Sequence, residues 1–356
     1  GSHRLHGPSW ACEPRVMTFA HPLPPIAIEH VLSDPGEVHT LIANGSPYYS
    51  VQRYVESLDQ LRALSEAGQD DRRAPHKPML VAPWFRGDWC VPGRPHVPGV
   101  ARFLEHPAFH SAAQQLFGAA VVRPEHVYVN LNPPLPKVDP GHVDVPCFRG
   151  ATRARLPVWL LQVMHKSELF GAWYVPTATA VSWFYAGQGG GFTYWPDGPD
   201  APPRSRPCMS NTALMGDNDH MFHAVEAVGG SDREVPMGLT LDATLRVTDE
   251  GYALEDRVRD AAGMPTGEVV TRKSYTRDEV RISVSWKALC FATEQEAARY
   301  DAGEDALTDV RILQTFVDDL RARGASFEEP TDLHSSPEFT ALLTRTYRRA
   351  PRVFSA

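Results

Sequence analysis

Residues 279–291, EVRISVSWKALCF, alternate between polar and apolar side chains over most of their length. Successive side chains of a β-strand point to opposite faces. The run therefore predicts a strand with Arg281 and Ser283 on one face and Ile282 and Val284 on the other. The polar face has two interpretations. It is either the solvated side of an edge strand, or an inward pair in which the Arg281 fork and the Ser283 hydroxyl together bind a carboxylate.

The segment that precedes this run is built from similar short strands. Between about residues 120 and 292, β-branched and aromatic stretches are separated by turns rich in Gly, Pro and Asp. We expect strands within 119–134, 180–187, 190–198, 211–217, 221–229, 238–247 and 267–275. Many short strands at this spacing are typical of a β-sandwich or barrel.

Helical patterns flank this β-rich part on both sides. Apolar spacing predicts helices over 50–68 and 99–118, the second broken near Pro107, and further helices after residue 292. Residues 1–50 are rich in proline and predicted to be irregular, and 156–171 is a helix or a long loop. We therefore expect one domain in three parts: an N-terminal Pro-rich and helical extension packing on the core (1–119), a β core (120–292) and a C-terminal helical extension (293–356).

Bulk properties restrict the class of partner. The chain has 356 residues and a formal net charge of −8, without a basic block that could follow a nucleic-acid backbone. Its apolar runs are too short to cross a bilayer, and no signal peptide is recognisable. Five cysteines without a CxxC pair favour a reducing cytoplasm over a disulfide framework or a structural zinc site. We expect a cytoplasmic protein, of a composition typical of GC-rich bacterial genomes, that acts on a small molecule and binds neither nucleic acid nor membrane.

A possible metal motif stands in residues 141–150, GHVDVPCFRG. His142 and Asp144 are two of the three ligand types of the two-histidine, one-carboxylate site that binds non-heme iron and leaves other positions open. Alone, such a pair is common on protein surfaces. A third ligand is available in the β-rich run 221–229, where His223 stands near the start of a predicted strand. His220 is a rival, but it lies in the polar turn DNDH, so His223 is preferred.

The order of these motifs carries more information than any one of them. His-x-Asp is followed by a Gly-rich hairpin over 184–198, then by the strand-borne His223 and by Arg281-x-Ser283. In this order the chain resembles the iron(II)/2-oxoglutarate-dependent dioxygenase superfamily over about residues 120–292. The resemblance implies a mainly β fold, a double-stranded β-helix (jelly roll, cupin-like) core with flanking helices. It also implies that His142, Asp144 and His223 bind Fe(II), that Arg281 and Ser283 bind the cosubstrate 2-oxoglutarate, and that O2 is consumed.

One spacing departs from the family pattern. The family arginine usually follows the distal histidine by about one strand and turn, a spacing that fits Arg233, whereas Arg281 is 58 residues beyond His223. Arg233 lies in a loop-like stretch, GGSDREVPMG, while Arg281 opens a strand. We therefore prefer Arg281, keep Arg233 as the runner-up, and interpret about 230–278 as an insertion.

The resemblance implies oxidation of a small metabolite or natural-product intermediate, with hydroxylation as the usual outcome and succinate and CO2 as coproducts. Asp144 argues against halogenation, because halogenases of this family lack the carboxylate ligand. Desaturation, cyclisation and epimerisation share the same ligand set and stay open. Substrate contacts are proposed for Asn130, Asn132, Arg149, Tyr185 and Trp195, with no catalytic group beyond the metal ligands. Two alternatives stay open: a mononuclear iron oxygenase that does not use 2-oxoglutarate, and a non-catalytic jelly-roll binding protein.

Overall fold

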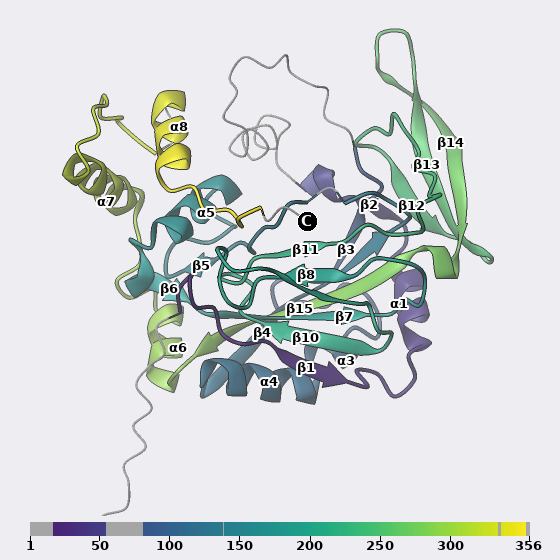
Figure 1. Cartoon of the computed structure of the whole chain (residues 1–356), viewed down its shortest axis with the longest axis horizontal. Coiled ribbons are helices and arrows are strands. Elements are labelled where there is room, and N and C mark those ends of the chain that lie inside the picture. The colour runs from purple at the N-terminus through teal and green to yellow at the C-terminus, as the bar shows by residue number, and fades with distance from the viewer. Residues whose placement is uncertain (1–16, 55–80, 138, 334–335, 354–356) are drawn as a thin grey trace, which may run out of the picture.

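The computed structural model describes residues 17–54, 81–137, 139–333 and 336–353 (Figure 1). Its largest element is one antiparallel sheet of ten strands. In spatial order these strands are β1 (Ile26–Glu29), β10 (Thr212–Gly216), β7 (Thr177–Trp183), β15 (Arg281–Phe291), β4 (Val121–Asn132), β3 (Phe85–Cys90), β2 (Tyr48–Ser50), β12 (Thr244–Val247), β13 (Gly251–Arg259) and β14 (Pro265–Thr276).

A small sheet faces part of this large sheet. It contains β11 (His223–Val225), β8 (Phe192–Tyr194) and β9 (Arg204–Arg206), in that order. A bridge between His142 and His223 adds the segment at His142 beside β11. Two further short strands, β5 (Cys147–Phe148) and β6 (Tyr174–Val175), pair with each other.

The chain passes repeatedly between the two sheets. From β4 it crosses to the small sheet at His142, returns to β7, crosses to β8 and β9, returns to β10, crosses to β11, and ends in β15. The result is a β10-β7-β15-β4 block opposite a β9-β8-β11-His142 block, which is the winding of a double-stranded β-helix or jelly roll. The predicted mainly β, jelly-roll fold with flanking helices is confirmed.

Strand β15 lies in the interior of the large sheet. It pairs with β7 on one side and β4 on the other, so the interpretation as a solvated edge strand is wrong. Its apolar face packs on the helical side, where Trp286 is fully buried, lies 5.6 Å from Phe109 between ring centroids, and donates from Nε1 to the Leu104 carbonyl. Its polar face looks towards the small sheet. Burial on both sides holds this strand's polar groups in fixed positions.

Helices cover the outer face of the large sheet and one end of the molecule. Figure 1 shows α3 and α4 on the side opposite β8 and β11, while α5, α7 and α8 gather at one end around a second apolar core. Helix α4 begins after His106, whose ring accepts from the Phe109 N–H, and ends at Gly118 in the left-handed conformation. The helices are α1 (Glu37–Gly45), α3 (Ala101–Leu104), α4 (Pro107–Phe117), α5 (Val158–Ser167), α6 (Glu294–Asp301), α7 (Asp309–Ala322) and α8 (Pro337–Thr346), with 3-10 turns at Val51–Tyr54, Gly171–Trp173 and Arg277–Glu279.

The structure differs from the sequence expectation in two places. Residues 1–119 contribute β1, β2, β3 and α1, although the pattern predicts no strand there. These strands are only three to six residues long, too short to display alternation, and each pairs with a strand distant in sequence. Strand β13 is also missing from the expectation, because it mixes acidic and basic residues with apolar ones. Most of the helix predicted over 50–68 lies outside the described residues.

The segment between β11 and β15 forms β12, β13 and β14, which extend the large sheet beyond β2. The β13–β14 hairpin projects from the body at the upper right of Figure 1. Within the described part of the chain, no helix is long and apolar enough to cross a membrane.

Candidate metal centre

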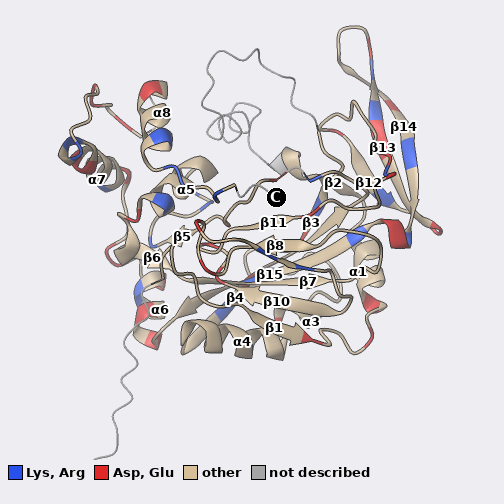
Figure 2. Ribbon diagram, in the orientation of Figure 1, with Lys and Arg blue, Asp and Glu red and all other residues tan. Residues whose placement is uncertain are grey.

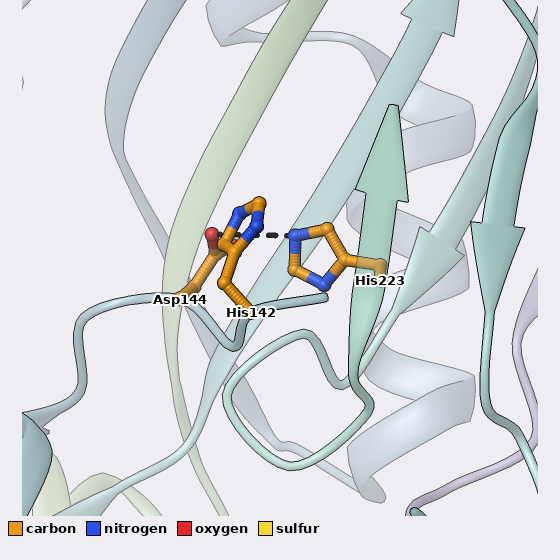
Figure 3. A group of neighbouring side chains, drawn as sticks. All are labelled: His142, Asp144 and His223. Atoms are coloured by element: carbon orange, nitrogen blue, oxygen red, sulfur yellow. Dashed lines mark ion pairs between the residues drawn. The ribbon is translucent and has the colours of Figure 1, made fainter. Parts of the chain in front are cut away.

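Three side chains from strand β11 and from the segment paired with it converge between the two sheets. His142, Asp144 and His223 each offer one ligand atom, and these atoms lie within 4.8 Å of one another (Figure 3). No other such group of His, Cys, Asp or Glu occurs among the residues described in the structure. The site remains open on one side, since the His142 side chain is 45% exposed while those of His223 and Asp144 are 8% and 13% exposed.

Backbone pairing places these residues. His142 and His223 exchange both backbone hydrogen bonds, at 3.0 and 2.9 Å, so the two rings stand side by side with centroids 4.4 Å apart. Two residues on, the Asp144 N–H donates to the Asn218 carbonyl in the loop that leads into β11. On the other side, Gln162 of α5 donates from Nε2 to the Asp144 carbonyl at 2.9 Å. The ligand segment is therefore tied on both sides.

Both histidines are held in the orientation that a metal requires. His223 Nδ1 donates to the Met221 carbonyl at 3.0 Å, and because a carbonyl only accepts, Nδ1 carries the proton and Nε2 keeps its lone pair. That Nε2 lies 3.6 Å from Asp144 Oδ1. His142 Nδ1 contacts the Asp139 carboxylate, which leaves its Nε2 available in the same way. Metal-binding histidines in proteins donate their second N–H to a carboxylate or a carbonyl, so the donor set fits a metal such as Fe(II).

The two oxygens of the Asp144 carboxylate have different environments. Oδ2 accepts from Lys287 Nζ at 2.7 Å and from Thr179 Oγ1 at 3.2 Å, whereas Oδ1 faces His223. Burial would raise the pKa of Asp144, but the Lys287 ammonium and the two histidines hold that pKa well below its usual value. Asp144 is therefore ionised, with one oxygen directed at the metal position.

Two residues of this arrangement are not among the sequence candidates. Lys287 continues the alternation Arg281, Ser283, Ser285 on the inner face of β15, a signal that the sequence does contain. Asp139, three residues before His142, lies in a proline-rich loop, where no periodicity indicates its direction.

Arg281 forms a second polar site on the same inner face. It is 1% exposed, and its hydrogen bonds go only to neutral groups: Nε to the Gly190 carbonyl at 2.6 Å, and Nη1 to Ser283 Oγ at 3.1 Å and Asn132 Oδ1 at 3.2 Å. No carboxylate of the described residues forms an ion pair with it, and a buried cation without a counter-ion is costly. An anionic ligand such as the distal carboxylate of 2-oxoglutarate would supply that counter-ion.

The Gly-rich hairpin makes this site possible. Gly190 has φ +71°, and a Cβ added there would lie 2.8 Å from Arg281 Cδ. Only glycine allows the backbone to approach the guanidinium this closely. The Gly-rich hairpin predicted from the sequence thus brings the Gly190 carbonyl within hydrogen-bonding distance of Arg281.

The runner-up Arg233 has another environment. Its Nε and Nη2 donate to the carbonyls of Val228 and Gly229, which ties a loop to the end of the strand region. His220, the rival ligand, pairs through Nδ1 with Asp217 and is not part of the cluster.

The five proposed substrate residues are spread over several environments. Asn132 contacts Arg281, as described above, and Asn130 accepts from Nε1 of Trp84, the residue just before β3. Tyr185 donates to the Gln188 carbonyl in the Gly-rich turn, and Trp195 is buried in a small core beside Val143. Arg149 donates to the Ala172 carbonyl near the second apolar core, among residues that do not belong to the metal cluster.

Beside the cluster lies a buried polar loop that the sequence marks only as a turn. Asp217, Asp219 and His220 are each at most 6% exposed. Asp219 Oδ2 accepts from the Tyr174 hydroxyl at 3.0 Å, while its Oδ1 has no hydrogen-bond partner within the described chain. Burial raises the pKa of Asp219 to about 7. This loop carries the Asn218 carbonyl that holds Asp144.

No model of a known protein family and no curated protein matches this sequence. Solved structures with a similar course of the chain include a non-heme α-ketoglutarate-dependent carbocyclase from nogalamycin biosynthesis (14% identity, TM-score 0.36, covering 80% of this chain and 89% of that one). Another is a 2OG-Fe(II) oxygenase family oxidoreductase from Burkholderia pseudomallei (10% identity, TM-score 0.32, covering 65% of this chain and 80% of that one). A third is a prolyl-4-hydroxylase from Pseudomonas putida (10% identity, TM-score 0.30, covering 76% of this chain and 93% of that one). At these TM-scores the likeness adds nothing to the strand order and side-chain geometry of the chain itself.

Proposed function

We propose that this chain is an Fe(II)- and 2-oxoglutarate-dependent dioxygenase that oxidises a small molecule. The observation that carries the proposal is the His142, Asp144 and His223 cluster at the open side of a jelly roll, with each histidine oriented through its Nδ1. Two histidines and one carboxylate leave further positions open on the metal for a chelating cosubstrate and for oxygen.

The residues of the chain have distinct roles in this proposal. His142 and His223 bind the metal through Nε2, and Asp144 through the oxygen that faces His223. Lys287 and Thr179 hold the other Asp144 oxygen, so the carboxylate stays ionised and binds through one atom. When bound, iron(II) supplies the redox chemistry by which O2 converts 2-oxoglutarate to succinate and CO2 and oxidises the substrate.

Arg281 supplies the cosubstrate specificity. Its buried guanidinium donates from Nε and Nη1 to neutral partners and has no acidic partner among the described residues, so a carboxylate group gains a charge-assisted, desolvated contact there. Ser283 orients the guanidinium and offers its hydroxyl beside it. Hydroxylation is the outcome we propose first, since the cluster retains its carboxylate ligand.

Anaerobic titration tests this proposal. Addition of Fe(II) and then 2-oxoglutarate to the full chain is expected to give a visible charge-transfer band that Asp144→Ala abolishes. Arg281→Met should weaken 2-oxoglutarate binding by about 100-fold, as expected for loss of a charge-assisted contact of about 3 kcal/mol. Arg233→Met is the matched control and should leave the affinity unchanged.

Absence of the band in folded wild-type protein would contradict the proposal. If the band persists at the same 2-oxoglutarate concentration in Arg281→Met but not in Arg233→Met, the cosubstrate arginine is Arg233 instead.

A further inference from the structure

The inner face of the large sheet continues past the metal cluster onto β4 and β3. The register puts His126 opposite Lys287 and Asn130 opposite Ser283, while Asp88 stands opposite Tyr128 on the next strand. Directly opposite residues of antiparallel strands share a face. We call Arg86, Asp88, His126, Tyr128 and Asn130 the β3–β4 polar patch.

This patch begins beside the metal ligands. Lys287 Nζ contacts Asp144 Oδ2 at 2.7 Å, and His126 is the cross-strand neighbour of Lys287. A molecule lying on the patch would therefore lie close to the metal cluster.

Contacts within the patch fix the direction of its side chains. His126 Nε2 donates to Asp88 Oδ1 at 3.0 Å, and Arg86 Nη2 reaches the same oxygen at 3.3 Å. The Arg86 guanidinium also lies 3.7 Å from the centroid of the Tyr128 ring. The Asn130 side-chain oxygen accepts from Trp84 Nε1, which directs its NH2 group the other way.

Three polar atoms of the patch have no hydrogen-bond partner within the described ranges: Asp88 Oδ2, His126 Nδ1 and Asn130 Nδ2. A structural carboxylate of the same sheet looks different. Asp256, on β13, accepts through Oδ1 and Oδ2 from Thr240 and, through Oδ1, also from Arg257. Asp88 uses one oxygen for all its contacts and is 27% exposed, so its second oxygen is available to a ligand.

The chemistry of these three atoms defines a ligand class. Asp88 Oδ2 is an acceptor, and so is His126 Nδ1, because the proton of the neutral ring is on the Nε2 that donates to Asp88. Asn130 Nδ2 is a donor. Hydroxyl groups satisfy both kinds of atom, since each donates one hydrogen bond and accepts others. A carboxylate would face two acceptors, and an ammonium would face the Arg86 guanidinium beside Asp88.

We propose that the β3–β4 polar patch binds the substrate and that the substrate is a neutral polyhydroxylated molecule, such as a sugar, glycoside or cyclitol ring. This inference rests on the proposed oxygenase function for the identity of the bound molecule as substrate. Donation to Asp88 and His126 and acceptance from Asn130 orient the ring, and the metal cluster beside Lys287 then faces one of its C–H bonds.

Saturation-transfer NMR on the full chain tests the assignment, with zinc(II), which is diamagnetic, added in place of iron. The probes are methyl β-glucoside and myo-inositol, with citrate as an anionic compound, 2-deoxystreptamine as a cationic one and toluene as an apolar one. Transfer is expected to the two neutral polyols. Asp88→Asn should reduce it at least five-fold, and so should Asn130→Asp, which replaces a donor by an acceptor.

Glu255→Gln is the matched control. Glu255 lies on β13 of the same sheet, pairs with Arg246 at 2.6 Å, and undergoes the same acid-to-amide change away from the metal cluster. It should leave transfer unchanged. Equal polyol signals in wild type and Asp88→Asn, both shown to be folded by circular dichroism, would overturn the proposal. Transfer only to the charged or apolar probes would also overturn it.

The outcome is separable from that of the proposed function. Asp144→Ala should lose metal but keep polyol transfer. A missing charge-transfer band together with Asp88-dependent polyol binding would overturn the oxygenase function and leave the patch as a binding site, and the reverse result would overturn the patch alone.

Discussion

Strands β15 and β14 belong to the same sheet and have 11 and 12 residues, yet they have opposite surroundings. β15 pairs on both sides and is buried at every position except the partly exposed Lys287, whereas β14 pairs only with β13 and exposes its first eight residues. Val269 on β14 is 55% exposed. Both segments form strands, but only β15 is buried on both faces, and this burial fixes its side chains in the positions that a site requires.

Two ion pairs make the same contrast. Lys287 lies 2.7 Å from Asp144 and Lys273 lies 2.8 Å from Glu234. The first pair is 16% and 13% exposed, and the second is 28% and 84% exposed. Figure 2 shows basic and acidic residues together along the β13–β14 hairpin, where water screens them. Two ion pairs with nearly equal N–O distances therefore contribute unequally to the free energy of unfolding.

The largest difference is expected from apolar truncation. Trp286→Ala on β15 should lower the free energy of unfolding by about 3–5 kcal/mol, since it leaves a large cavity against Phe109. Val269→Ala on β14 should cost less than about 0.5 kcal/mol, because the side chain is already exposed. Urea unfolding followed by circular dichroism measures both. Similar losses for the two variants would contradict this difference and show that the hairpin is packed in solution.

The pKa of Asp219 reports how far water is excluded from the buried region around the metal cluster. Burial raises its pKa from 3.8 to about 7, so folding favours the protonated form of Asp219. The contribution of this protonated form to the free energy of unfolding is complete below about pH 4 and is lost as the pH rises through 7. In metal-free protein, Asp219→Asn should therefore gain stability relative to wild type between pH 4 and pH 8, by up to about 4 kcal/mol for a three-unit shift. Urea unfolding at several pH values measures the gain.

An Asp-to-Asn substitution on β13 should instead lower the free energy of unfolding. Asp256, buried on β13, accepts hydrogen bonds through both oxygens, so Asp256→Asn should destabilise the protein at pH 8. A constant difference between Asp219→Asn and wild type from pH 4 to pH 8 would mean that water reaches Asp219.

The two lysines provide the smallest of the three tests. Lys287→Met leaves the Asp144 carboxylate buried with only the Thr179 hydroxyl and should cost about 3 kcal/mol in metal-free protein. Lys273→Met should cost less than about 1 kcal/mol. Zinc(II) should recover part of the loss in Lys287→Met, because a cation replaces the ammonium. Thermal unfolding with and without zinc measures this, and equal losses in the two variants would contradict the difference in burial.

The β-rich core and the strand that carries Arg281 are both predictable from the amino-acid sequence. Local patterns suffice there, because alternation and Gly-Pro-Asp turns are properties of neighbouring residues. The helices around Pro107 and after residue 292 follow for the same reason. The motif order also selected His142, Asp144 and His223 as candidate ligands, which the fold brings within 4.8 Å.

Which atoms act together depends on how strands that are distant in sequence pair. Strand β15 is central because β4 and β7, distant in sequence, pair on its two sides. Lys287 holds Asp144, and Asp88 meets His126, through cross-strand register that no single segment encodes. Short strands such as β1 have too few residues to show a period and form only because a partner strand is present. Local periodicity thus indicates where strands are, while their pairing sets which side chains form the site.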